Sequence, residues 1–314
     1  MSDPLHVGQT GDDYRGFEQS DFDRFAAISG DNNPIHVDPA FAARTKFGRT
    51  VAHGMLLYSV VCSVLGTSVP GPGTVQLEQE LMFPNPTYTG EMIHAHVELT
   101  QLDEAAGVAC LTTVLLREGG KPGLEGRTWV RVPGARPEWP GVETRPAPSR
   151  GPGTETWPTP GRGPGMETRP TPGRAGEAFK GLVLGLRAET RRAFGLSDLA
   201  EYVDLVNDEN PIFADVAYAR RLGFRDVLVP GGLLGGMISF LLGTRLPGQG
   251  TNYLKQRLEF PAPAYAGQEL TAAVEVVRLR PEKQLVNLAT TVQGPSGEVV
   301  CRGEALVLVS DVGA

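Results

Sequence analysis

Two stretches of this chain align with each other at one constant offset of 177 positions, without a gap. Asp31 returns as Asp208, and Asn33-Pro34-Ile35 returns as Asn210-Pro211-Ile212. Other residues that recur at this offset are Ser20 and Ser197, Asp38 and Asp215, Phe47 and Phe224, Gly54 and Gly231, Tyr88 and Tyr265, and Gly126 and Gly303. Self-similarity at a fixed spacing is typical of a duplicated structural unit, so we expect two copies of one fold of about 120 residues. The copies are expected to pack as an internal dimer.

The segment between the two copies, residues 134–178, has a very different composition. It holds ten of the chain's 26 prolines together with nine glycines, and a twelve-residue unit recurs in it. Such a composition favours extended, polyproline-like conformers over a packed core. We therefore assign residues 1–133 to an N-terminal repeat, 134–178 to a linker and 179–314 to a C-terminal repeat. A passive spacer is the expected role, and docking of its PxxP-like segments on an aromatic groove is the alternative.

Charge and cysteine content narrow the classes of partner and compartment. The 36 acidic and 29 basic side chains give a formal charge of −7, which repels a phosphate backbone, so a nucleic-acid partner is not expected. Cys62, Cys110 and Cys301 lack metal-ligand or CxxC spacing, so neither a disulfide framework nor a zinc site on cysteine is indicated. A cytoplasmic location fits this pattern, and the first 14 residues hold no apolar stretch typical of a secretory signal.

Two long uncharged runs raise the question of a membrane span. Residues 51–77 and 227–244 contain no Lys, Arg, Asp or Glu. Proline and glycine interrupt both runs, which leaves continuous apolar helices of about 11 to 14 residues, whereas a span needs about 20. We therefore expect buried core helices and no membrane partner.

Each copy is expected to begin with helices and to end with strands. Ser20 and Asp23 predict a capping box at the start of a short helix. The helices expected in the first copy cover residues 20–28, 39–46 and 54–69, and the strands cover residues 74–83, 91–101, 108–116 and 126–132. A long buried helix followed by an antiparallel sheet is an α+β layout, in which a curved sheet can wrap the helix.

Residues 30–57 carry the most specific motif, GDNNPIHVDPAFAARTKFGRTVAHGMLL. In these residues the chain resembles the hydratase signature of the MaoC-like, (R)-specific enoyl-CoA hydratases, which have the hot-dog fold. Asp, Asn-Pro, His, Asp-Pro, Phe and His-Gly-Met occur in the order and spacing of that family. The resemblance covers residues 14–133 and 181–310, and two copies on one chain resemble the double hot-dog members of the family. It implies an α+β double hot-dog, with a long central helix wrapped by a curved antiparallel sheet in each repeat.

Hydration of an enoyl thioester needs a group that takes a proton from water and a source of the proton for Cα. Asp31 and His36 have the right side chains for this pair, and the resemblance implies that they hold the attacking water between them. Which of the two is the base stays open. The backbone N–H of Gly54, at the start of the apolar helix, is the candidate for stabilising the negative charge on the thioester oxygen.

The family implies an (R)-specific 2-enoyl-CoA hydratase that also runs as a 3-hydroxyacyl-CoA dehydratase, without a metal or other cofactor. The alternatives are an acyl-CoA thioesterase and a non-catalytic acyl-CoA binding protein. The substrate is expected to be an acyl-CoA, with a thioester of acyl carrier protein as the other possibility, and a homodimer is possible.

Simpler structural roles compete with some of these assignments. Asn33 is a candidate substrate-binding residue, although shaping the loop by local hydrogen bonds is the more usual role of an Asn before Pro. His53 is expected to be structural. His94 and His96 lie two apart on an expected strand and so face one side, but no third ligand is evident, which favours a solvated surface over a metal site.

The C-terminal copy departs from the motif at the positions of the two histidines. Phe213 stands in place of the histidine, and Pro230 stands in place of His53. A phenyl ring cannot exchange a proton, so this copy is predicted to be catalytically silent. Gly235 and Gly236 in its apolar helix suggest either room for an acyl chain or close helix packing.

An acidic protein that binds coenzyme A needs a local basic patch. Arg44, Lys46 and Arg49 follow the catalytic motif and form one candidate. Lys255 and Arg257 form the other, because the first copy has Glu78 and Glu80 at the same offset, and this inversion of charge suggested a phosphate site at one pocket only.

Overall fold

The computed structural model describes residues 4–134 and 178–312, in which each repeat contributes five strands and one long helix. The N-terminal repeat contains β1 (Thr10–Gly16), α1 (Gln19–Ser29), α2 (Pro34–Val37), α3 (Pro39–Ala42), α4 (Gly54–Thr67), β2 (Val75–Met82), β3 (Met92–Asp103), β4 (Val108–Arg117) and β5 (Pro122–Arg131). The C-terminal repeat contains β6 (Arg187–Ala193), α5 (Leu196–Val206), α6 (Val216–Arg221), α7 (Gly231–Thr244), β7 (Asn252–Glu259), β8 (Glu269–Arg280), β9 (Leu285–Gln293) and β10 (Val299–Leu308), with short 3₁₀ turns at Pro211–Phe213 and Pro281–Lys283. The predicted linker lies outside the described residues except for its two ends.

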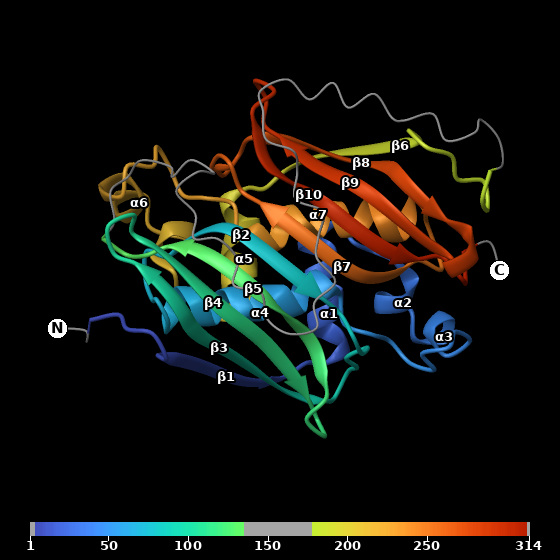
Figure 1. Ribbon diagram of the computed structural model, residues 1–314, viewed down its shortest axis with the longest axis horizontal. Coiled ribbons are helices and arrows are strands. Elements are labelled where there is room, and N and C mark those ends of the chain that lie inside the picture. The colour runs from blue at the N-terminus through green and yellow to red at the C-terminus, as the bar shows by residue number, and fades with distance from the viewer. Residues whose placement is uncertain (1–3, 135–177, 313–314) are drawn as a thin grey trace.

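The ten strands form one sheet in the order β1-β3-β4-β5-β2-β7-β10-β9-β8-β6, with every neighbouring pair antiparallel. The two repeats meet where β2 pairs with β7, so the sheet order of the second repeat mirrors that of the first. Figure 1 shows the long helices α4 and α7 behind this sheet, where they pack against each other. The predicted α+β architecture and the internal pairing of the repeats are confirmed.

The helix α4 is apolar on all sides because it is enclosed on all sides. Twelve of its fourteen residues are buried, between the sheet of its own repeat and the helix α7. A helix without a polar face is stable in a folded protein only in such a position. Its observed bounds agree with the helix predicted from the sequence, and no helix among the described residues is long and apolar enough to span a membrane.

Glycines in α7 permit its close packing against the N-terminal repeat. A Cβ on Gly235 would lie 2.4 Å from the sulfur of Met55, and a Cβ on Gly236 would lie 2.7 Å from the Cβ of Ser29. These two glycines therefore serve close packing, and the suggestion that they open room for an acyl chain is wrong.

Other differences from the sequence-based expectation occur at the edges of the structure. The strands β1 and β6 were not predicted, because they are polar edge strands with only one neighbour and little apolar alternation. The capping box of α1 was assigned to the wrong residues: the carboxylate of Asp21 accepts the N–H of Glu18 at 2.9 Å, and the helix begins at Gln19. The three cysteines are buried and unpaired.

Candidate active site

The loop that follows α1 places the predicted acidic residue in the interior. Gly30 ends the helix with a φ of +85°, a conformation that glycine adopts without strain. Asn33 then caps α2, since its side-chain oxygen accepts the N–H of Ile35 at 3.4 Å and Pro34 occupies the first helical position. The structure thus confirms the loop-shaping role of Asn33, which also lines the cavity described below.

Asp31 is a buried carboxylate in this loop, with only 1% of its surface exposed. One carboxylate oxygen accepts the N–H of Asn33 at 3.4 Å, so the residue does form the Asx-turn that its position before Asn-Pro suggests. Burial raises the pKa of Asp31, while the nearby His36 and the hydroxyl of Ser239 act in the opposite direction. The turn and a chemical role are therefore compatible.

His36 lies beside this carboxylate and presents one ring nitrogen for chemistry. Its Nδ1 lies 2.7 Å from the carbonyl oxygen of Val51, so Nδ1 carries the proton and Nε2 is left with a free lone pair. A carboxylate oxygen of Asp31 and one ring nitrogen each of His36 and His53 lie within 4.8 Å of one another. Burial lowers the pKa of His36, although the Asp31 carboxylate acts against this shift. A neutral imidazole beside a carboxyl group is a suitable acid–base pair.

His53 holds the backbone of this pair in place. Its Nε2 lies 2.9 Å from the carbonyl oxygen of Asp31, and its ring stacks on that of His36 with 3.9 Å between the centroids. The side chain is completely buried, and burial lowers its pKa well below the ordinary value. These contacts agree with the structural role expected from the sequence.

A cavity of about 140 Å³ adjoins the pair and is built from both repeats. The N-terminal repeat contributes Asn33, His36, Gly54 and Phe83 among others. From the C-terminal repeat come Ser239, Leu242, Gly243, Thr251, Asn252, Tyr253 and Leu254. Asp31 does not itself line the cavity. Its carboxylate lies next to His36 and Ser239, which do.

Gly54 lies at the first position of α4, on the wall of this cavity. A Cβ at this position would come within 2.9 Å of the ring of Phe83, so only glycine fits here without a shift of that ring. The N–H groups in the first turn of a helix have no intrahelical acceptor, and the helix dipole favours negative charge there. The backbone of Gly54 can therefore act as the predicted oxyanion donor.

Ser239 is the functional residue that the sequence reasoning missed. It comes from α7 of the C-terminal repeat and lines the cavity next to Asp31. The available signal was a hydroxyl group in the middle of an almost wholly apolar helix. Its partner at the 177-residue offset is Cys62, a small buried side chain of α4.

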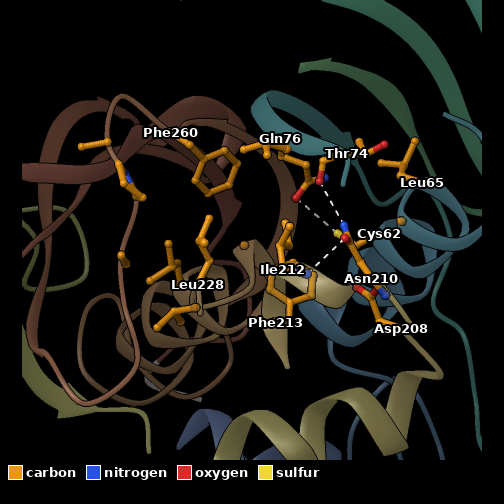
Figure 2. A pocket seen from close by; sticks show the side chains of 18 residues that line it. Cys62, Leu65, Thr74, Gln76, Asp208, Asn210, Ile212, Phe213, Leu228 and Phe260 are labelled. Atoms are coloured by element: carbon orange, nitrogen blue, oxygen red, sulfur yellow. Dashed lines mark hydrogen bonds between the residues drawn. The ribbon is translucent and has the colours of Figure 1, made fainter. Parts of the chain in front are cut away.

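The C-terminal repeat has an equivalent but much smaller cavity of about 50 Å³, drawn in Figure 2. Asp208 and Asn210 remain there, but Phe213 and Cys62 take the places of His36 and Ser239. Asn210 accepts the N–H of Gly73 and donates to the carbonyl of Thr74, both at 3.0 Å, which ties this loop to the N-terminal repeat. Burial raises the pKa of Asp208 to about 7. The sequence of the C-terminal repeat contains no histidine, so its cavity lacks the imidazole of the acid–base pair.

The first predicted basic group flanks a cavity residue in the sequence. Phe47 lines the cavity, and Arg44, Lys46 and Arg49 surround it in sequence as exposed side chains. Lys46 pairs with Asp311 at 3.0 Å. Arg49 pairs with Glu91 at 3.0 Å, and Arg44 lies over the ring of Phe41. Two of the three cations thus already meet a carboxylate.

The second predicted basic group lies on a strand at the junction of the repeats, and its arginine is paired with carboxylates. The Nε of Arg257 lies 2.6 Å from Glu78, and its Nη2 lies 2.9 Å from Glu259. Gln256 and Leu258 are fully buried, and Lys255 and Arg257 alternate with them along β7. Lys255 and Arg257 therefore lie on the sheet face away from the helices. Arg257 is therefore held by carboxylates where β2 meets β7, and the inversion of charge reflects cross-strand pairing between the repeats.

Comparisons with known proteins agree with this division into two halves. Residues 6–116 match the family described as a MaoC like domain, and residues 188–303 match the FAS1-like dehydratase domain region. An (R)-specific enoyl-CoA hydratase of Aeromonas caviae is 42% identical over 129 residues, which cover 41% of this chain and 96% of that protein. A 3-hydroxybutyryl-CoA dehydratase of Methylorubrum extorquens is 39% identical over 132 residues, which cover 41% of this chain and 82% of that protein.

A solved protein of Mycobacterium tuberculosis resembles the whole chain in fold. It is described as having a double hotdog fold, and the two structures agree with a TM-score of 0.69 over 97% of each chain, at 17% sequence identity. At this identity the likeness concerns the fold alone. Together with the sheet order, it confirms the predicted double hot-dog.

Proposed function

This chain belongs to the MaoC-like dehydratase family, and on that premise we propose that it is an (R)-specific 2-enoyl-CoA hydratase, which also runs in reverse as a 3-hydroxyacyl-CoA dehydratase. The observation that carries the proposal is the buried pair of Asp31 and His36, of which His36 lines a cavity formed by both repeats. The C-terminal cavity lacks this pair, so one active site per chain is proposed.

The proposed reaction uses the pair on a single water molecule. The water is held between the Asp31 carboxylate and Nε2 of His36, at the cavity wall. As its oxygen bonds to Cβ of the enoyl group, one of the two side chains takes a proton from the water, and the pair passes that same proton on to Cα. The net result is addition of H and OH across the double bond, and both side chains return to their starting state after one proton exchange.

Negative charge builds up on the thioester oxygen while water adds. The N–H of Gly54 points from the N-terminus of α4, where a donor and the helix dipole can stabilise that oxygen. Loss of one such donor costs about 10²–10³ in kcat in other enzymes. His53 keeps the carbonyl of Asp31 fixed, and it has no proton-transfer role in this scheme.

The coenzyme A phosphates are assigned to Arg44, Lys46 and Arg49, which flank a cavity residue in the sequence. Arg257 is left out of this assignment because two carboxylates already hold its guanidinium. Lys46 and Arg49 each meet a single carboxylate, and Arg44 lies over the ring of Phe41. Whether the thioester carrier is coenzyme A or acyl carrier protein is a further part of the proposal, and coenzyme A is preferred because the named relatives act on CoA thioesters.

The proposal is tested by incubating the purified chain with crotonyl-CoA. Loss of the absorbance of the conjugated double bond without release of free thiol indicates hydration, and chiral analysis should find (R)-3-hydroxybutyryl-CoA. Release of thiol would instead indicate a thioesterase. Binding of the ligand without either change would indicate a non-catalytic binding protein. His36→Phe serves as the matched control, since it introduces the residue of the silent repeat.

A further inference from the structure

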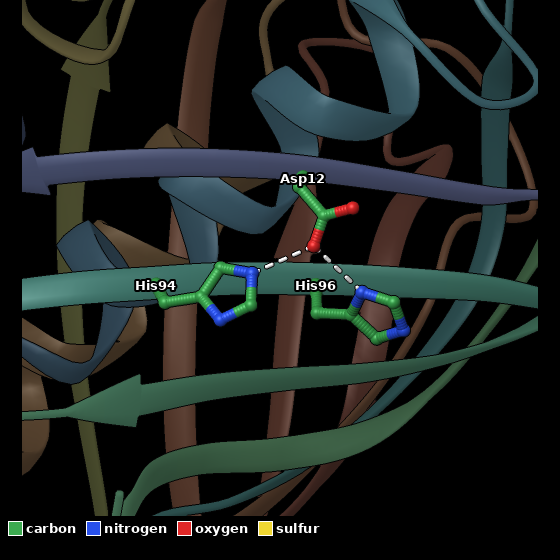
Figure 3. A group of neighbouring side chains, drawn as sticks. All are labelled: Asp12, His94 and His96. Atoms are coloured by element: carbon green, nitrogen blue, oxygen red, sulfur yellow. Dashed lines mark hydrogen bonds and ion pairs between the residues drawn. The ribbon is translucent and has the colours of Figure 1, made fainter. Parts of the chain in front are cut away.

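A second cluster of titratable side chains lies on the outer face of the sheet, outside the cavity. Asp12 on β1 faces His94 and His96 on β3 (Figure 3). One carboxylate oxygen of Asp12 lies 2.6 Å from Nε2 of His94 and 2.8 Å from Nδ1 of His96. All three side chains are partly exposed, with 41%, 26% and 31% of their surfaces accessible, respectively.

The strands position these groups without local strain. On β3 Ala95 lies between the histidines and Val97 follows them, and both are fully buried, so His94 and His96 both point away from the helices. The antiparallel register sets Asp12 directly opposite His96. The ring of Tyr14 stacks on that of His94 at 4.1 Å with an interplanar angle of 3°, which limits rotation of the imidazole.

No cation stands opposite the histidines on the neighbouring strand. Their cross-strand partners on β4 are Leu116 and Val114. Two imidazole nitrogens and one carboxylate oxygen thus converge from two adjacent strands, with solvent on the open side.

We propose that Asp12, His94 and His96 bind one Zn²⁺ ion. Zinc prefers imidazole nitrogen and carboxylate oxygen at about 2.0–2.2 Å, with three protein ligands and a water in the fourth position. Ligand atoms around such a tetrahedral ion lie about 3.4 Å apart, so the carboxylate contacts of 2.6 and 2.8 Å would each lengthen by less than about 1 Å. The two imidazole nitrogens lie within 4.8 Å of each other. The exposed side chain of Asp12 has room for that movement. A bound ion would fasten the edge strand β1 to β3.

The C-terminal repeat provides an internal control for this site. At the 177-residue offset Asp12, His94 and His96 correspond to Glu189, Thr271 and Ala273, listed in the same order. The equivalent surface therefore has no imidazole ligands, and one site per chain is expected.

The sequence alone did not reveal this site because its third ligand lies on a strand that was not predicted. Zinc was set aside for His94 and His96 when no other ligand was evident near them. The pairing of β1 with β3 supplies Asp12.

The test titrates the metal-free full chain with Zn²⁺ in competition with a chromophoric chelator at pH 7.5. The wild type should bind one ion with a Kd of about 10 μM or lower, and the double variant His94→Thr/His96→Ala, which copies the C-terminal repeat, should weaken binding at least ~100-fold. Asp12→Asn should weaken it about tenfold. His6→Ala removes an exposed histidine elsewhere and should leave binding unchanged. Saturating Zn²⁺ should raise the Tm of the wild type by a few degrees and that of the double variant by much less.

Proton NMR of the wild type gives a readout that does not depend on any variant. The chain has five histidines, and Zn²⁺ should shift the ring signals of two of them. Absence of binding below about 100 μM, or wild-type affinity in the double variant, would overturn the proposal. NMR shifts confined to His36 and His53, which form a second possible metal site with Asp31, would also overturn the proposal.

Discussion

The N-terminal and C-terminal repeats keep the same buried aspartate, but they surround it with different neighbours. Asp31 has a histidine beside it and a serine from the opposite helix, next to a cavity of about 140 Å³. Asp208 has a phenylalanine and a cysteine at those positions, and its cavity is about 50 Å³. The comparison teaches that a buried aspartate in this loop does not by itself make the proposed site, which also needs the histidine and the serine beside it.

A duplicated chain can specialise in a way that a dimer of identical chains cannot. In a dimer, every substitution appears at both sites at once. Here the loop of one repeat and the helix of the other build the active cavity, and the complementary loop and helix build the silent one. The same freedom allows Arg257 to face Glu78 and Glu80 across the junction of the repeats, where identical residues would repel.

The largest effect is expected when the active repeat is given the residue of the silent one at the histidine position. His36→Phe should lower kcat for crotonyl-CoA at least ~10³-fold, because one member of the acid–base pair is lost. The Tm should change little, since the C-terminal repeat accommodates phenylalanine at the equivalent place. Steady-state hydration kinetics and a thermal melt measure the two quantities. Turnover within tenfold of the wild type would show that His36 takes no part in proton transfer.

The next effect concerns the junction between the repeats. Arg257→Glu copies Glu80 and places carboxylates opposite each other, so it should lower the free energy of unfolding by about 2–4 kcal/mol. Urea denaturation measures this loss. Lys255→Glu on the same face is the matched control and should cost less than about 1 kcal/mol. Reversal of the pair in the double variant Glu78→Lys/Arg257→Glu should recover part of the lost stability. A rise in the KM for crotonyl-CoA in Arg257→Glu, in proportion to the change of charge, would instead support a phosphate-binding role for Arg257.

A smaller effect is expected from the buried carboxyl group of the silent repeat. The pKa of Asp208 is about 7 in the folded chain and about 3.8 when unfolded, so its contribution to stability is fully present below pH 3.8 and is lost as the pH rises towards 7. Asp208→Asn removes that loss. The variant should be more stable than the wild type by about 2 kcal/mol at pH 8, with little difference at pH 4. An equal stability difference at both pH values would mean that Asp208 has an ordinary pKa.

The smallest effect is expected at the serine that the C-terminal repeat lends to the active cavity. Ser239→Cys copies Cys62 and replaces a strong hydrogen-bond donor with a weak one. It should reduce kcat about tenfold with little change in KM, because a hydrogen bond to an ionised group is worth about 1.5–3 kcal/mol. Cys62→Ser in the silent repeat is the control and should leave turnover unchanged. A rise in KM alone would assign Ser239 to substrate binding.

The sequence predicted the features that depend on the order of residues within one repeat. The apolar helix at residues 54–67, the four strands that follow it and the group of Asp31, His36 and Gly54 all have local signals. The features that it missed depend on contacts between distant segments. Ser239 and Arg257 have roles only because the other repeat packs against them, and Asp12 faces His94 only because a polar edge strand joins the sheet. Local patterns carry no information on which of two similar halves supplies a partner.

The central claim, that one repeat catalyses and the other supports it, is tested most directly by comparing Asp31→Asn with Asp208→Asn in the crotonyl-CoA hydration assay. Both changes replace a buried carboxyl group with an amide of the same shape, so differences in folding are small and can be checked by circular dichroism. Asp31→Asn should lower kcat by 10² or more, and Asp208→Asn should leave it within about twofold of the wild type. Near-normal turnover in a folded Asp31→Asn variant, or an equal loss in both variants, would contradict the claim.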